Sequence, residues 1–269
     1  MQKITIFHLN RHFANTMLGD VIFFSLLCFS ILYTSYEMAN KLKNPIKEIV
    51  LSVSFEQNID IAQLESISNN KQLLSDFSTC KPGFDAKVSL GEEPSSEFSH
   101  TGYIFKSDKA EYSSILNIKR GKISYHILNE YLSYDVILDT LDRYWNILQN
   151  EVGGLNITNV SARYINQINV SKTETFNDFV NVEIKSPFKN IKGKFINFNL
   201  EFPDKNLIKT NVIIANSNEN NLILDIIVDK ICKKELVKNI SDILIELRPI
   251  KNEIFNTIIT EGTKNKFEL

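Results

Sequence analysis

The chain has 269 residues, of which 43% are hydrophobic and 23% are charged, and its net charge is −2. This composition is typical of a folded globular protein and excludes disordered, collagen-like and low-complexity chains. The charge shows no basic surplus, so we do not expect general nucleic-acid binding. Three cysteines are too few for a disulfide framework.

The N-terminal segment differs from the rest of the chain because residues 21–33, VIFFSLLCFSILY, are almost all apolar. A membrane span needs about 20 apolar residues, so this run is short for a span and fits a signal-peptide core. Residues 1–37 therefore have three interpretations: a mis-assigned start upstream of Met38, a signal peptide or anchor over residues 18–36, or a packed helix. We expect a cytoplasmic protein if translation starts at Met38 and a membrane-associated protein otherwise.

The first half of the remaining chain reads as strands followed by a helix. Residues 46–55 predict a strand, 59–68 a short helix, and Lys81-Pro82-Gly83 a turn. Residues 134–152 carry apolar side chains at helical spacing and predict the clearest helix of the chain. Between the turn and this helix we expect four strands, near 84–91, 98–107, 111–120 and 122–130.

The second half has the same order of elements. A long strand is predicted over 157–170, followed by a loop or short helix near 174–182. A final helical stretch covers about 234–262, and Pro249 inside it predicts a break or kink. Between them we expect three strands, near 190–202, 207–216 and 221–229.

These elements predict an α+β fold with a mainly antiparallel sheet, or sheets, and two long covering helices. The repeated order would also allow two similar halves. We therefore divide the chain into a leader of doubtful status over 1–37, an N-terminal half over 38–154 and a C-terminal half over 155–269. A single continuous sheet is equally consistent with the pattern.

The sequence contains no G-x-G-x-x-G, P-loop, H-E-x-x-H or G-x-S-x-G motif, and it predicts neither a metal site nor a cofactor. His100 and His126 lie in predicted strands and are candidate general bases or binding residues. Asp225 and Asp229 are four residues apart on a strand, which separates them by about 13 Å and prevents them from sharing one metal ion. We interpret them as solvent-facing.

The strand over 157–170 contains three further candidate binding residues. Tyr164 and Asn166 share one face, and a buried Asn166 would need hydrogen-bond partners. Arg163 lies on the other face, where its guanidinium could bind a carboxylate or phosphate, or could join neighbouring elements through a salt bridge.

Three segments together resemble an uncharacterised, sporadically distributed family of bacterial proteins. These are NPIKEIVLSVSFE at 44–56, ARYINQI at 162–168 and NEIFNTIIT at 252–260, which are similar to the family's P-I-x-E strand, R-Y-x-N-x-I strand and F-x-x-x-I-T helix. The resemblance implies an accessory function, such as a mobile-element or phage-related module, and the family has no assigned activity that could be transferred to this chain. It is carried by Pro45, Glu48, Phe55, Arg163, Tyr164, Asn166, Phe255 and Thr260.

The absence of a recognised catalytic motif favours a non-catalytic binding or interaction module that acts with a neighbouring gene product. One alternative is an enzyme with an unrecognised site that uses Arg163, His100 or His126. Another is a membrane-tethered interaction protein, anchored through residues 18–36. Exposed sheet edges would also allow a homodimer.

Overall fold

The computed structural model describes residues 45–267, with gaps at 90–94, 109–111, 129–131, 172–173, 183–194, 203–204, 219–220 and 234–238. The predictions for residues 1–37 lie outside this part of the chain. Residues Pro45–Leu269 form one compact unit. In the described residues, no helix combines the length and the apolar character that crossing a membrane requires.

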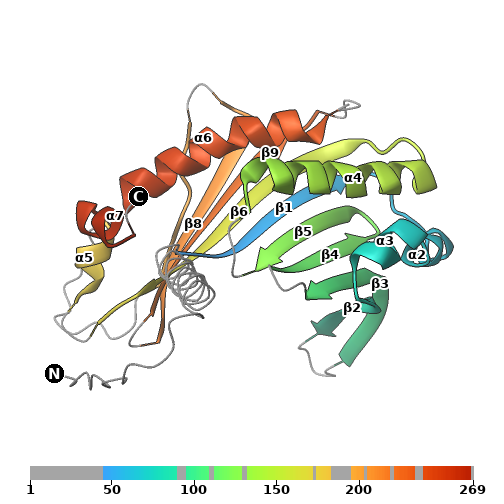
Figure 1. The fold of residues 1–269 in the computed structure, drawn as a ribbon, viewed down its shortest axis with the longest axis horizontal. Coiled ribbons are helices and arrows are strands. Elements are labelled where there is room, and N and C mark those ends of the chain that lie inside the picture. The colour runs from blue at the N-terminus through green and yellow to red at the C-terminus, as the bar shows by residue number, and fades with distance from the viewer. Residues whose placement is uncertain are drawn as a thin grey trace, which may run out of the picture. The chain divides into compact units, whose positions relative to one another are not determined.

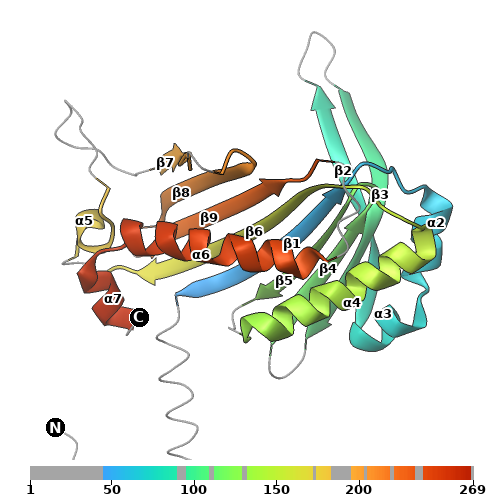
Figure 2. The ribbon, with the colours of Figure 1, turned by 90° about the horizontal axis from the view of Figure 1, so that it is seen from above.

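In the described residues, nine strands form one antiparallel sheet in the order β2-β3-β4-β5-β1-β6-β9-β8-β7 (Figures 1 and 2). The strands that begin the two predicted halves, β1 and β6, pair with each other, so the sheet continues across the predicted boundary. The strand bounds are β1 Ile46–Phe55, β2 Thr79–Ser89, β3 Ser95–Asp108, β4 Ser113–Lys119, β5 Lys122–Leu128, β6 Ile157–Asn169, β7 Phe195–Phe198, β8 Ile208–Asn218 and β9 Asn221–Ile231.

The prediction of two long covering helices is wrong, because the described residues form six helices, most of them short. Four of these helices have eight residues or fewer, whereas α4 and α6 have 19 each. Side-chain caps begin short helices that the pattern does not reveal; Asn70, for example, accepts a hydrogen bond from the backbone of Gln72 at the start of α3. The helix bounds are α2 Ile61–Ser68, α3 Lys71–Asp76, α4 Tyr134–Val152, α5 Phe176–Phe179, α6 Ile240–Ile258 and α7 Glu261–Phe267.

The core lies between one face of the sheet and the helices α4 and α6, which run across the strands (Figure 2). Alternate side chains of each strand point to this face; Leu51 and Leu224 are fully buried there, as are Leu141 and Leu247 of the helices. No described helix covers the opposite face of the sheet (Figure 1). The other set of alternate side chains on the central strands is therefore turned away from the core.

Two local predictions based on proline are also corrected. Pro82 does not mark a turn but lies inside β2, opposite Tyr103 of β3. Strand β2 ends the sheet, and an edge strand tolerates a residue without a backbone N–H. Pro249 does not break α6, which continues to Ile258, so the predicted break is wrong and the alternative of a kink stays a prediction.

Candidate functional site

A row of small polar residues crosses the uncovered face at the centre of the sheet. Ser52 of β1 lies between Ser124 of β5 and Ser161 of β6, as the direct cross-strand partner of each. Asn117 of β4 extends the row beyond Ser124, and Asp229 of β9 extends it beyond Ser161. Because serine side chains are short, the three serines form the floor of a depression.

Longer side chains on the neighbouring rows form the walls of this depression, which we call the serine trough. Its volume is about 520 Å³. Apart from Val50 and Ile227, the trough is lined by polar or charged residues, namely Ser52, Asn117, Lys119, Lys122, Ser124, His126, Asn159, Ser161, Arg163 and Asp229.

Arg163 is fixed at the wall of the trough by Asp225 of β9. Its Nε donates to Asp225 Oδ1 at 3.0 Å and its Nη2 donates to Oδ2 at 2.7 Å. Asp225 is buried, so the prediction that it faces solvent is wrong. The hydrogen bonds that Arg163 donates to Asp225 raise the pKa of Arg163, and the Nη1 group makes no hydrogen bond within the described part of the chain. Arg163 is thus a positioned cation with one free edge.

His126 connects three side chains of the uncovered face. Its Nδ1 lies 2.7 Å from Glu48 Oε1, and its Nε2 lies 3.1 Å from both Ser124 Oγ and Asn117 Nδ2. With the ring proton on Nδ1, the imidazole donates to Glu48, and Nε2 accepts from the Ser124 hydroxyl and the Asn117 amide.

Three cations and one carboxylate line the trough, and two of the cations are paired with carboxylates outside the lining. Burial lowers the pKa of Lys122, and the nearby Asp229 carboxylate opposes this effect. Lys119 donates to Asp85 at 2.7 Å, whereas Lys122 forms no ion pair among the residues that the structure describes. The described lining therefore places three cations, on Lys119, Lys122 and Arg163, against the single carboxylate of Asp229.

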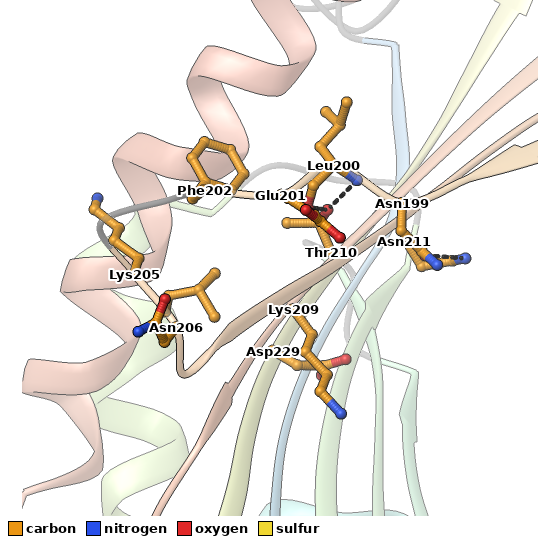
Figure 3. A pocket seen from close by; sticks show the side chains of 11 residues that line it. Asn199, Leu200, Glu201, Phe202, Lys205, Asn206, Lys209, Thr210, Asn211 and Asp229 are labelled. Carbon is orange, nitrogen blue, oxygen red and sulfur yellow. Dashed lines mark hydrogen bonds between the residues drawn. The ribbon is translucent and has the colours of Figure 1, made fainter.

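A second hollow of about 540 Å³ shares Asp229 with the trough and is lined by polar and apolar residues of β8 and of the segment 199–206 (Figure 3). Thr210 joins the two sides of this hollow, because its hydroxyl accepts from Leu200 N at 2.8 Å and donates to Leu200 O at 2.7 Å. The Asn211 amide donates to Asn199 Oδ1 at 3.1 Å. The segment after β7 is thereby attached to β8.

Of the five candidate residues from the sequence, the structure brings Arg163 and His126 together at the trough. Tyr164 and Asn166 are buried on the face that the helices cover. There the Asn166 amide donates to Leu224 O at 3.0 Å, and the Lys251 ammonium lies 4.2 Å from the centre of the Tyr164 ring. These two residues have structural partners and do not reach the trough.

His100 also lies away from the trough. Its Nε2 is 2.9 Å from the Gly102 carbonyl oxygen, and its ring packs against Phe84 and Tyr103. Ser124 and the serine floor were not predicted from the sequence, and Glu48 was named only for the family resemblance and not as a site residue. One local signal was available, because Ser124 and His126 are two residues apart on a strand and must share a face.

No protein-family model matches the chain, and a search of the curated proteins finds no significant match. The resemblance to a bacterial family therefore stays a prediction. Two residues that carry this resemblance lie on the uncovered face, where Glu48 contacts His126 and Arg163 contacts Asp225. Two others, Phe55 and Asn166, are buried in the core.

Proposed function

We propose that the protein is a binding module that acts with a protein partner, the product of a neighbouring gene, and that the serine trough is its recognition site. The observation that carries this proposal is the ion pair between buried Asp225 and Arg163. A buried ion pair stabilises a fold no better than well-packed apolar side chains. What this pair provides is a guanidinium held in one orientation with a free edge at the trough, which is how binding sites are pre-organised.

The chemistry of the trough favours a partner that presents a carboxylate. A guanidinium edge binds a carboxylate through two parallel hydrogen bonds. Lys122 adds a cation without an ion-pair partner among the described residues, and the hydroxyls of Ser52 and Ser161 make no hydrogen bond within that part of the chain. We therefore expect an acidic side chain or a C-terminal carboxylate of the partner to enter the trough. If translation starts at Met38, the two proteins meet in the cytoplasm.

Charge reversal at the trough tests this proposal. We would compare proteins captured from the native host by the full chain, by Lys122→Glu and by the control Lys71→Glu. Lys71 is exposed at the start of α3, outside the trough lining, and undergoes the same change of charge. We expect a stoichiometric partner with the wild type and the control, and its loss with Lys122→Glu. Equal capture by all three proteins would refute the trough as the recognition site.

An enzyme is the second candidate function, because the trough joins Arg163 and His126 with Glu48 and Ser124. The membrane-tethered alternative depends on residues 18–36, which lie outside the described part of the chain.

A further inference from the structure

We infer that Ser124 is a nucleophile, activated by His126 and Glu48, that attacks carboxylic esters bound in the serine trough. The inference goes beyond the proposed binding function. Ser124 Oγ lies 3.1 Å from His126 Nε2, and His126 Nδ1 lies 2.7 Å from Glu48 Oε1. This is the order of groups that activates a serine hydroxyl, with a base within hydrogen-bond reach and a carboxylate that orients the base.

The Glu48 carboxylate contacts Nδ1 of His126, which is the ring nitrogen that this chemistry requires. A Glu48 carboxylate at Nδ1 holds the ring proton there, so the Nε2 lone pair faces the Ser124 hydroxyl. All three residues stand on the adjacent central strands β1 and β5, which are paired over seven residue positions. Strands position reacting groups more tightly than loops do.

The side-chain amide of Asn117 can form a hydrogen bond with Nε2 of His126 in both protonation states of the imidazole. Its Nδ2 donates to Nε2 at 3.1 Å, while its Oδ1 is buried without a hydrogen-bond partner among the described residues. When Nε2 has taken the serine proton it becomes a donor, and a half-turn of the Asn117 amide presents Oδ1 to it. Asn117 Oδ1 would thus accept a hydrogen bond from His126 at the step when the imidazole is charged.

The negative charge that forms on the carbonyl oxygen of the ester must be stabilised by side chains. Strand β5 is paired on both sides, with β4 and β1, so its backbone N–H groups are engaged in the sheet. Arg163 and Lys122 line the same trough as Ser124 and supply positive charge there. Such groups stabilise the charge that develops in acyl transfer.

The reaction balances with water as the other reactant. Ser124 Oγ bonds to the acyl carbon while its proton passes to His126 Nε2. The bond from the acyl carbon to the ester oxygen then breaks, and the leaving alcohol takes the proton from His126. Water attacks the acyl-serine, gives a proton to His126, and releases the carboxylic acid as the proton returns to Ser124 Oγ.

A fluorophosphonate probe and mass spectrometry test this inference on the full chain. We expect an adduct on Ser124 in the wild type and no adduct at position 124 in Ser124→Ala. In His126→Gln, labelling should be slower by a factor of about 100 or more. Ser75→Ala is the matched control, because Ser75 is exposed in α3, outside the trough lining, and this variant should label normally. Glu48→Gln should slow labelling while far-ultraviolet circular dichroism stays unchanged.

The inference is overturned if Ser124 stays unlabelled where a known serine esterase is labelled fully, or if His126→Gln labels at the wild-type rate. The binding proposal is tested separately. Loss of the partner with Lys122→Glu and no labelling of Ser124 would leave a binding module without this activity. Labelling of Ser124 and equal capture by all variants would instead leave the activity without the proposed partner site.

Discussion

Replacing Arg163 by Met should destabilise the protein strongly because it leaves the Asp225 carboxylate buried without its cation. The side chain of Asp225 is 6% exposed and that of Arg163 is 42% exposed. Removing one partner of a buried ion pair costs about 3–5 kcal/mol. Since Arg163 partly reaches solvent, we expect the lower end, about 3 kcal/mol. Methionine retains an apolar stem, so the loss reports mainly on the charge.

Replacing the other partner of the ion pair, Asp225→Asn, should lower the free energy of unfolding much less. The freed guanidinium can turn to water, and the new amide still accepts a hydrogen bond, so we expect about 1 kcal/mol. In the double variant no charge is stranded, and its stability should exceed that of Arg163→Met alone. This order of stabilities identifies the buried carboxylate as the source of the effect.

Urea unfolding followed by circular dichroism and by the fluorescence of Trp145 measures these differences. The slopes of the unfolding free energy against urea should agree among the variants, which shows that the folded states are comparable. Two results would contradict this reasoning: an equal loss of unfolding free energy in Asp225→Asn and Arg163→Met, or a loss in the double variant equal to the sum of the two. Either would show that the buried Asp225 carboxylate is not the source of the effect.

Three further predictions concern other parts of the fold. Gly102→Ala would place a Cβ 2.0 Å from the Ile118 carbonyl oxygen, so we expect a loss of about 3 kcal/mol or more in urea unfolding; Gly83→Ala, with no contact under 3.5 Å, should lose under about 1 kcal/mol. Burial lowers the pKa of Lys251 from 10.5 to about 8, so between these pH values the unfolded chain binds more protons and stability rises with pH. Relative to Lys251→Met, the wild type should therefore gain about 2 kcal/mol between pH 8 and 10. Pro249→Ala should raise the free energy of unfolding by about 1 kcal/mol, because the interior of α6 gains a backbone donor while the unfolded chain gains freedom.

A specific result would contradict each of these three predictions. Equal losses for the two glycine variants would exclude the close approach of β3 and β4 at Gly102. A flat or falling stability difference over this pH range would exclude a depressed pKa for Lys251. A loss of stability in Pro249→Ala would show that the proline ring makes packing contacts that exceed the gain from the backbone.

The elements with strong periodicity were predictable from the sequence. The helix expected over 134–152 coincides with α4, since its apolar stripe and its cap at Ser133 are local signals. The prediction failed where the position of a strand in the sheet decides the local structure. Pro82 is an example, because an edge strand tolerates a proline. The short helix α3 depends on the cap at Asn70, a residue that is equally common in turns.

The candidate site could be predicted only in part, because it depends on which strands become neighbours. Glu48 and His126 are 78 positions apart in the sequence, and Arg163 and Asp225 are 62 apart. Their contacts require β1 to lie between β5 and β6, and β9 to pair with β6 in one register. A shift of one residue would turn these side chains to the opposite face, and a single strand's pattern does not fix the register.

The most direct test of the central claim, that a partner binds in the serine trough, is photo-crosslinking in the native host. A photoreactive residue would replace Lys122, and a second protein would carry it at Lys71 as the control. The account predicts one discrete crosslinked protein from position 122 and none from position 71. No crosslink at position 122, or the same products from both positions, would contradict it.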